Sequence, residues 1–228
     1  MIHANSVSVI VVAAGAGTRM RSDVRKPWLD LAGVPVVVRT IGRFAPLEFV
    51  REIILVVHPD DVARAEALRA TCPKLLVAPG GDHRVDSVRR GLALVSKGCE
   101  LVAVQDGVRP FVTEALIRRT CEAALETGAA LPVAPVPATL KEVRRGSSRV
   151  ERTVPREGLF EAQTPQVFRV ELLRRAYESP GASDVTDDAQ AVERLGEPVA
   201  TVEGARHNIK ITTPEDLALA ETILRMEA

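Results

Sequence analysis

Aromatic residues are scarce in this sequence, and charge of neither sign is in excess. Phe, Trp and Tyr together make up 3% of the 228 residues, which leaves little material for a surface on which nucleic-acid bases could stack. Thirty Lys and Arg residues balance thirty Asp and Glu residues, so no overall positive field draws the protein to a polyanion. We therefore expect no nucleic-acid partner, and any phosphate-binding site must come from a local cluster of cations.

Cysteine and long apolar runs are rare as well. Cys72, Cys99 and Cys121 are widely spaced and form no Cys-x-x-Cys pair, which favours reduced thiols over a disulfide framework or a zinc site. No stretch approaches the roughly 20 apolar residues that a membrane helix needs, and the first residues lack the basic start of a signal peptide. These features predict a cytoplasmic protein with no membrane partner.

Short β-branched runs alternate with longer amphipathic stretches along most of the chain. This alternation predicts an α/β fold over a single domain of residues 1–228, with a Rossmann-like, mostly parallel sheet flanked by helices. In such sheets ligands bind beyond the carboxyl ends of the strands, so the residues that follow each strand are the candidates for function. Strands are expected at 7–14, 52–57, 74–78, 101–105 and 130–134, and helices at 60–70, 85–95, 113–126, 170–177 and 187–195.

The chain is expected to finish with a pair of strands and a helix. Apolar residues at 199–202 and 208–211 predict the strand pair. Thr213 is typical of a helix N-cap, Pro214 suits the first helical position, and Asp216 lies near the third. The last helix should therefore begin at Pro214.

The alternation breaks at about residues 136–160, where the sequence predicts a β-hairpin inserted into the domain. Strand-like runs at 139–143 and 149–154 flank the turn signal Arg-Gly-Ser-Ser at 145–148. The insertion is rich in Arg and Glu and has few apolar positions, so it cannot build a core of its own. A solvated excursion would satisfy this pattern, but we favour a protruding dimerisation arm that packs on the second subunit of a homodimer.

A glycine-rich loop at residues 13–21 follows the first expected strand directly. Its small residues allow backbone N–H groups to approach a phosphate chain and form an anion-binding concavity. Arg19 adds a planar fork for phosphate oxygens, and Lys26 adds a compact point charge. A dinucleotide fingerprint would need glycine where Met20 stands, and no Gly-Lys-Ser/Thr follows to make a P-loop. The loop residues expected to bind the nucleotide are Ala13, Ala14, Gly15 and Gly17.

Five motifs, in order along the chain, carry a resemblance to a known family. The first is Ala-Ala-Gly-Ala-Gly-Thr-Arg-Met at 13–20 with Lys26 after it, which resembles the sugar-phosphate nucleotidyltransferases. The others are Gly-Gly-Asp-His-Arg-Val-Asp-Ser-Val at 80–88, Asp-Gly-Val-Arg-Pro at 106–110, Thr-Pro-Gln at 164–166, and Asn-Ile-Lys at 208–210 with Thr-Pro-Glu-Asp at 213–216. Together they span nearly the whole chain and resemble the 2-C-methyl-D-erythritol 4-phosphate cytidylyltransferase family of the non-mevalonate isoprenoid pathway.

The resemblance implies an enzyme that joins CTP to methylerythritol phosphate and releases pyrophosphate. In the family, CTP lies across the glycine-rich loop, and the cytosine is read by backbone near the first strand and by the segment that holds Gly81, Asp82 and Ser87 here. A mispaired buried polar group costs about 1–3 kcal/mol, which would allow this segment to reject uracil.

The resemblance also implies which charged groups serve the reaction. Asp106, at the end of an expected strand, would be a hard oxygen ligand for Mg²⁺ or another divalent cation, with triphosphate oxygens and water completing the octahedron. The attacking phosphate is already an anion, so the site must supply alignment and charge stabilisation rather than a general base. Arg19, Lys26 and Lys210 would supply that stabilisation.

On the substrate side, the matching positions lie partly in the hairpin. Thr139 and Arg156 would bind the phosphate group of methylerythritol phosphate across a dimer interface, because an arginine fork pairs well with a phosphate of about two negative charges. Thr164 matches a substrate-side threonine. Gly107 is a further candidate for substrate contact, and Arg109, three residues after the expected metal ligand, is a candidate partner for a substrate phosphate or for Asp106 itself.

Some positions depart from the family pattern. Arg25 precedes Lys26 where proline is frequent, and Gln105 stands where histidine is frequent. Ala138 and His207 stand where the family often has aspartate, and both lie on the sugar-phosphate side. A cytidylyltransferase for another sugar phosphate, such as ribitol 5-phosphate, therefore remains an alternative.

Other classes of protein share parts of this pattern. A non-catalytic nucleotide-binding regulator would keep the loop and lose Lys26, Asp106 or Lys210, but all three are present. An NAD-dependent oxidoreductase would need a third glycine and an acidic residue at the end of the second strand, where Val-His-Pro stands at 57–59. A molybdenum-cofactor guanylyltransferase or an N-acetylglucosamine-phosphate uridylyltransferase would share the first loop, but the segment at 80–88 counts against both.

Overall fold

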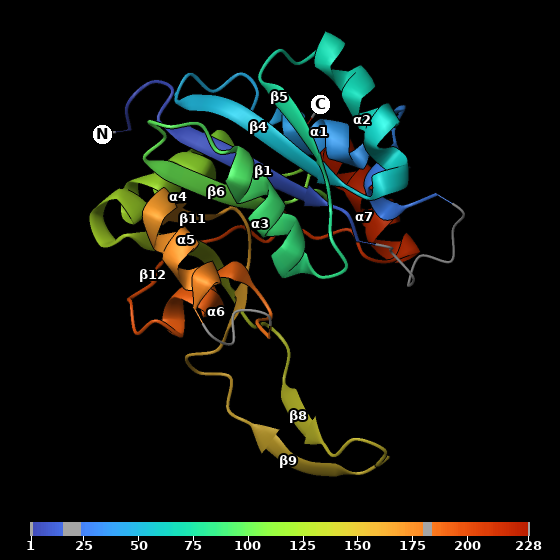
Figure 1. Ribbon diagram of the computed structural model, residues 1–228. Coiled ribbons are helices and arrows are strands. Elements are labelled where there is room, and N and C mark those ends of the chain that lie inside the picture. Colours follow the sequence, from blue (N-terminus) through green and yellow to red (C-terminus); the bar gives the residue numbers. More distant parts are fainter. Residues whose placement is uncertain (1, 16–23, 180–183, 228) are drawn as a thin grey trace.

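The computed structural model describes residues 2–15, 24–179 and 184–227. Its centre is one twisted sheet with helices on both faces (Figure 1). The strand order is β10-β7-β11-β6-β1-β4-β5, and β12 also pairs with β7. The strands of this sheet are β1 (Val7–Ala13), β4 (Val50–Val57), β5 (Leu75–Pro79), β6 (Leu101–Asp106), β7 (Ala129–Pro135), β10 (Phe160–Ala162), β11 (Gln166–Arg169) and β12 (Ala200–Glu203).

The sheet is mostly parallel, as the sequence predicts. β1 pairs in parallel with β4 on one side and β6 on the other, β5 extends the sheet beyond β4, and β12 runs parallel to β7. The two short strands β10 and β11 are antiparallel to their neighbours. The five strands expected from the sequence all form, and their ends differ from the expected ones by at most two residues.

Helices cover both faces because the central strands are apolar on both sides. Along β1, Val9 and Val11 pack into one core cluster and Ile10 into the other, which is the alternation that a pleated strand imposes. One face is covered by α1 (Val36–Gly42), α2 (Val62–Ala67) and α4 (Glu114–Thr127), and the other by α3 (Arg84–Leu94), α5 (Val170–Glu178) and α6 (Asp188–Glu193).

The last helix, α7 (Pro214–Glu227), builds a third and smaller cluster with Leu31, Val36 and Phe111. Leu31 belongs to β2 (Asp30–Leu31), which forms a short ribbon with β3 (Val34–Pro35). The start of α7 follows the expected cap: the amide of Asp216 donates to Thr213 Oγ1 at 3.3 Å, and the Asp216 carboxylate accepts from the amide of Thr213 at 2.8 Å. Thr213 and Pro214 therefore do what their local pattern predicts.

One expectation about the elements is wrong and another holds in part. The stretch at 60–70 is helical throughout, but both ends of α2 tighten into the 3₁₀ turns η3 (Pro59–Asp61) and η4 (Leu68–Ala70). The stretch at 208–211 is not a strand, and β12 pairs with β7 instead of with it. The backbone of Ile211 bonds singly to Val108 O at 2.9 Å, while its side chain fills the third cluster, which explains the apolar pattern.

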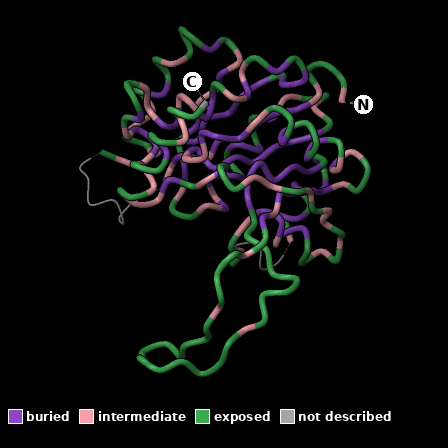
Figure 2. Tube along the Cα trace, turned by 180° about the vertical axis from the view of Figure 1, so that it is seen from behind, coloured by how far each residue is buried: buried purple, intermediate pink, exposed green. Residues whose placement is uncertain are grey.

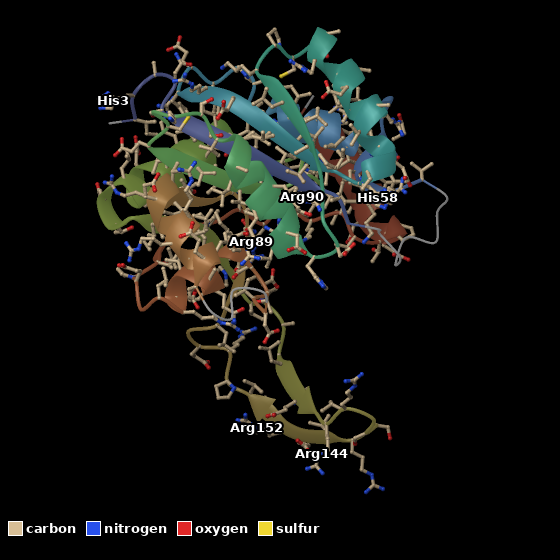
Figure 3. All side chains as sticks on the ribbon, in the orientation of Figure 1. His3, His58, Arg89, Arg90, Arg144 and Arg152 are labelled. Atoms are coloured by element: carbon tan, nitrogen blue, oxygen red, sulfur yellow. The ribbon has the colours of Figure 1, made fainter. Side chains whose placement is uncertain are left out.

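A β-hairpin extends from the body of the molecule (Figure 1). It consists of β8 (Leu140–Val143) and β9 (Val150–Val154), which form a two-stranded sheet of their own. Nearly all of its residues are exposed, whereas the sheet of the body is buried (Figure 2). Arg144 and Arg152, labelled in Figure 3, form ion pairs with Glu residues of the same hairpin. Within the described residues, the structure contains no helix with the length and apolar character needed to cross a membrane.

Candidate active site

A cavity of about 550 Å³ lies at the carboxyl edge of the sheet, where β1, β4 and β6 end. The chain runs from β1 outward through β4 and β5 and then returns to place β6 on the other side of β1, so the edge between β1 and β6 is a topological switch point. This is the position at which open α/β sheets bind their ligands. The cavity is lined by residues 12–15, 26, 27, 58, 59, 80–84, 87, 106, 108 and 210–212.

The floor of the cavity is made of backbone segments in close contact. The amide of Gly80 donates to Val57 O at 2.6 Å, at the end of β4, and the amide of Gly107 donates to Val12 O at 2.9 Å. A Cβ atom on Gly80 would clash with the side chain of Ala14, and one on Gly107 would lie 3.0 Å from the Cβ of Ala13. Glycine is therefore required at position 80, and the close approach leaves the floor lined by small groups.

The turn between β5 and α3 presents backbone toward the cavity. The amide of Gly81 donates to Ser87 Oγ at 3.2 Å, and this hydroxyl donates to His83 O at 3.3 Å. The amide of His83 donates to the carboxylate of Asp86 at 3.2 Å, which caps α3. Ser87 is buried, so its hydroxyl fixes the turn from inside while Asp82 stays exposed at the cavity.

Asp106, the last residue of β6, is surrounded by three cations. Its Oδ1 lies 3.0 Å from Arg84 Nη1, and its Oδ2 lies 2.9 Å from Lys210 Nζ and 3.3 Å from Arg109 Nε. Burial by itself would raise the pKa of Asp106, but the charges of Arg84, Lys210 and Arg109 outweigh burial and hold it well below its usual value. The carboxylate is therefore ionised, and one negative charge holds three positive charges at the cavity wall.

Arg84 also contacts a second, fully buried carboxylate. Its Nη2 lies 2.6 Å from Asp188 Oδ2, and the other oxygen of Asp188 accepts a hydrogen bond from the Tyr177 hydroxyl. Burial by itself would lower the pKa of Arg84, but the negative charges of Asp188 and Asp106 outweigh burial and raise the pKa above its usual value. The guanidinium therefore stays charged. The sequence predicted no role for Arg84, because only its place just after the glycine turn distinguishes it from a surface arginine. Its partner, 104 residues along the chain, leaves no local signal.

Thr164 supports Asp106 on the side away from the cavity, and Asn208 in turn supports Thr164. The amide of Asp106 donates to Thr164 Oγ1 at 3.1 Å, and Thr164 is buried. Asn208, which is fully buried, donates from Nδ2 to Thr164 O at 3.0 Å, while its own carbonyl accepts from Arg109 Nη1 at 2.7 Å. Thr164 thus supports the metal-ligand candidate instead of lining either cavity.

A second cavity, of about 370 Å³, adjoins the first, because Lys210 lines both. Arg109 and Arg206 bring positive charge to it, and Asn208 and Gln163 bring amide groups. The other lining residues are Ala134, Pro135, Pro137, Glu161, Ala162 and Ile209. Three cations against one carboxylate suit an anionic ligand of modest size.

The structure brings most of the expected site residues together and leaves some apart. Gly107 and Thr164 lie beneath or behind the cavity wall, and Arg109 faces the second cavity. Thr139 and Arg156 lie exposed at the foot of the hairpin and line neither cavity of their own chain. Gly17 and Arg19 lie outside the described residues. The expected residues that line the first cavity are Ala13, Ala14, Gly15, Lys26, Gly81, Asp82, Ser87, Asp106 and Lys210.

The donor set fits a metal that arrives with the nucleotide. Among the described residues, no three His, Cys, Asp or Glu side chains come together as a metal cage. Asp106 offers a hard, ionised oxygen at the cavity and Asp82 is the second carboxylate that lines it, and Mg²⁺ is commonly held by one or two carboxylates together with substrate phosphates and water. The residues therefore suit a Mg²⁺–triphosphate complex and not a resident metal centre.

Comparisons with known proteins show the family of this chain. The family model of 2-C-methyl-D-erythritol 4-phosphate cytidylyltransferase matches residues 7–226. The chain is 39% identical to the protein of that name from Alkaliphilus oremlandii, over 99% of this chain and 98% of that protein. It is 44% identical to the bifunctional enzyme IspD/IspF of Desulfotalea psychrophila over 96% of this chain, but spans only 56% of that longer protein.

Solved structures show the same fold. The crystal structure of 2-C-methyl-D-erythritol 4-phosphate cytidylyltransferase from Thermus thermophilus superposes with a TM-score of 0.79 at 37% identity, covering 96% of this chain and 99% of the other. That of 4-diphosphocytidyl-2C-methyl-D-erythritol synthase from Anaerococcus prevotii gives a TM-score of 0.84 at 32% identity, with 96% of each chain covered.

Proposed function

The chain belongs to the 2-C-methyl-D-erythritol 4-phosphate cytidylyltransferase family, and from that premise we propose a role for each part of its site. The protein is a nucleotidyltransferase that joins CTP and 2-C-methyl-D-erythritol 4-phosphate in isoprenoid precursor biosynthesis. The products are 4-diphosphocytidyl-2-C-methyl-D-erythritol and pyrophosphate. The observation that carries the assignment of roles is the cluster of Lys210, Arg109 and Arg84 around Asp106, at the wall shared by two cavities.

We assign the first cavity to CTP. Ala13, Ala14 and Gly15 bring backbone amides to the triphosphate at the end of β1, where small residues permit close approach. The cytosine lies against the turn of Gly81, whose backbone Ser87 fixes from inside. Fixed donors and acceptors distinguish cytosine from uracil because the wrong base would leave a buried polar group unpaired, at a cost of about 1–3 kcal/mol.

The reaction is an in-line displacement at the α-phosphorus of CTP. A phosphate oxygen of methylerythritol phosphate forms the new P–O bond, the bond from the α-phosphorus to the bridging oxygen breaks, and pyrophosphate leaves with that electron pair. The attacking oxygen is already anionic, so no proton has to be removed. Lys26 and Lys210, both at the first cavity, stabilise the charge that grows on the phosphoryl oxygens and the leaving group. Arg19 is assigned to the same work on its sequence position alone.

Mg²⁺ or a similar divalent cation, when bound with CTP, would supply further charge neutralisation at the triphosphate. Asp106 is the residue that would hold it. Lys210 Nζ lies 2.9 Å from the same carboxylate and has a side chain that is 44% exposed, so it can turn from Asp106 to a phosphate oxygen. Asp106 thereby keeps Lys210 near the reacting groups before substrate arrives.

We assign the second cavity to methylerythritol phosphate, with Arg109 and Lys210 facing its phosphate. Thr139 and Arg156 do not line this cavity in their own chain, although Arg156 donates to the carbonyl of Pro137, which does line it. We infer that they serve the site of a second copy in a homodimer. The apolar side chains of Val143, Val150 and Phe160 are about half exposed on the hairpin and at its foot, which suits burial against a partner.

The assay that tests the chemistry measures pyrophosphate release with each of the four NTPs, Mg²⁺ and methylerythritol phosphate. Release with CTP alone, dependent on the sugar phosphate, is the expected result. Equal release with ribitol 5-phosphate would overturn the assignment of the second cavity. Omitting the divalent cation should abolish release, and unchanged release in a chelator would remove the role given to Asp106.

Mixing inactive variants tests the shared site. Arg156→Ala damages the residue donated to the partner, whereas Lys210→Ala damages the receiving site, so each homodimer should be inactive. A refolded mixture forms heterodimers in which one site carries both intact residues, and part of the activity should return. A mixture that stays inactive while both variants remain folded would place Arg156 at the site of its own chain.

The three cysteines, Cys72, Cys99 and Cys121, are free, and two of them are buried. Burial, with the nearby charge of Glu122, raises the pKa of Cys121 to about 12, so its thiol stays protonated. We propose from these reduced thiols that the protein works in the cytoplasm.

A further inference from the structure

Arg25 ties together two segments that are distant in the sequence. Its Nη2 lies 2.6 Å from Asp60 Oδ2, and its Nη1 lies 3.2 Å from Asp61 Oδ1. The two contacts use both terminal nitrogens of the guanidinium, which is a geometry that a lysine ammonium cannot reproduce. The side chains of Arg25 and Asp61 are 28% and 13% exposed, so their contact is partly shielded from water, whereas Asp60 is 69% exposed. We refer to the contacts of Arg25 with Asp60 and Asp61 as the Arg25 clasp.

The two segments that the clasp joins are two walls of the CTP cavity. Lys26 and Pro27 line the cavity from the turn η2 (Lys26–Trp28), directly after Arg25. His58 and Pro59 line it from the end of β4 and the turn η3, directly before Asp60. Figure 3 labels His58 at this edge of the sheet. The Arg25 clasp thus lies one residue outside each of these two walls, and it fixes the spacing between them.

The other end of the same turn is fastened independently. The indole of Trp28 is buried at 4% exposure, and the guanidinium of Arg64, on α2, lies 4.4 Å from its ring centroid. The amide of Trp28 donates to Arg25 O at 2.9 Å, which closes the turn around Lys26. Arg25 and Trp28, on either side of Lys26–Pro27, therefore both contact the segment from η3 to α2. The contact of Arg25 is ionic, and that of Trp28 is the stacking of Arg64 on its ring.

We propose that Arg25 is a positioning residue for Lys26: the clasp holds the wall that carries Lys26 at the distance from His58–Pro59 at which the lysine ammonium meets the triphosphate. This inference rests on the proposed role of Lys26. A long, flexible lysine side chain acts well only when its backbone is fixed, because a small displacement of a reacting group lowers the rate strongly. The clasp acts through the wall and touches no substrate atom.

The first test is the variant Arg25→Gln, measured by kcat, by KM for CTP and by KM for methylerythritol phosphate. We expect kcat to fall about tenfold, with KM for methylerythritol phosphate unchanged, since Lys26 acts in the transition state. Arg69→Gln is the matched control, because Arg69 also forms an ion pair of 3.2 Å, with Glu66, but on the outer side of α2 and η4. It should leave kcat unchanged.

The same contact can be removed from its other side. Asp60→Asn with Asp61→Asn should reproduce the loss in kcat, and adding Arg25→Gln to this pair should cause no further loss. Arg25→Lys should recover only part of the rate, because one ammonium cannot bridge both carboxylates. If Arg25→Gln does not fold, the aspartate pair carries the test, and normal kcat in that pair would overturn the proposal.

A double-mutant cycle with Lys26→Ala separates this inference from the proposed function. If the clasp acts through Lys26, Arg25→Gln lowers kcat in the parent enzyme and has no further effect once Lys26 is alanine. Additive losses would overturn the positioning role and leave the role of Lys26 intact. Normal turnover in Lys26→Ala itself would overturn the role of Lys26, and the inference with it.

Discussion

Arg84 and Lys210 contact different oxygens of the Asp106 carboxylate: Arg84 Nη1 lies 3.0 Å from Oδ1, and Lys210 Nζ lies 2.9 Å from Oδ2. The carboxylate is thereby fixed in rotation, with one oxygen directed to the buried side of the site and the other to the wall shared by the two cavities. Arg84 is itself fixed, because its second nitrogen contacts Asp188 in the core.

Replacing Arg84 by Gln should therefore damage both stability and turnover. Asp188, which is fully buried, would keep the Tyr177 hydroxyl as its side-chain partner among the described residues, and breaking a buried ion pair from one side costs about 3 kcal/mol or more. Asp106 would lose the contact that fixes its rotation. Denaturant unfolding should show the lost stability, and steady-state assays should show a lower kcat.

The double variant Arg84→Gln with Asp188→Asn separates the two effects. It removes the buried charge along with its partner, so most of the lost stability should return. Turnover should stay low, because Asp106 still lacks its Oδ1 contact. Recovery of turnover together with stability would show that the orientation of Asp106 does not depend on Arg84.

Asp106 should give the protein a dependence of stability on pH. A carboxyl whose pKa is depressed in the folded state stabilises the fold above its unfolded pKa, and this contribution is lost as pH falls through the folded value. Its usual pKa is 3.8, and Arg84, Lys210 and Arg109 overcome burial to lower it. Melting temperatures of the parent and of Asp106→Asn should therefore differ most at neutral pH and converge below about pH 4. A constant difference down to strongly acid pH would contradict the depressed pKa.

Lys26→Ala should lower kcat by at least about a hundredfold, because it removes an electrostatic donor that acts on the transferring phosphates. The melting temperature is measured alongside, so that a loss of turnover is separated from a loss of folding. Lys97→Ala, at an exposed position after α3, is the matched lysine control and should retain full turnover. Near-normal turnover in a folded Lys26→Ala protein would exclude the lysine from the chemistry.

Gly80→Ala should weaken CTP binding. The new methyl group would clash with the Cβ of Ala14 and lie 3.2 Å from Val57 O, so the floor of the cavity must shift. Overpacking of this kind costs about 1–3 kcal/mol, and KM for CTP should rise. Gly42→Ala is the control, because a Cβ at the end of α1 meets no atom within 4 Å. An unchanged KM for CTP in Gly80→Ala would show that the floor can relax without affecting the nucleotide.

The elements that the sequence predicts well are those with local causes. The β-branched runs of β1, β4 and β6 are long enough to mark central strands, and Thr113 and Thr213 act as caps within three residues of their position. The segment at 208–211 shows the limit of this reasoning. Alternating apolar side chains indicate burial, but they do not reveal whether the backbone pairs with another strand or, as here, bonds singly to Val108 O.

The site residues also divide into those that the sequence predicts and those that it does not. Motif spacing places Lys26, Asp82, Asp106 and Lys210 near one nucleotide, and the structure gathers all four at one cavity. The role of Arg84 could not be predicted, because it depends on Asp188, whose position is set by the packing of α6 and not by any neighbouring sequence. Thr139 and Arg156 are assigned from family positions alone, and neither lines a cavity of its own chain, since the proposed effect needs a second copy.

Arg109 is anchored by the carbonyl of Asn208 and Lys210 by the carboxylate of Asp106, so residues 99 positions apart in the sequence build one cluster of cations. During synthesis on the ribosome, this cluster stays incomplete until residue 210 has emerged. A product of interrupted translation that stops before Lys210 contains the glycine-rich loop but cannot finish the wall that both substrates share. On the role proposed for Lys210, chains that stop before this residue should bind CTP at the loop without turning it over.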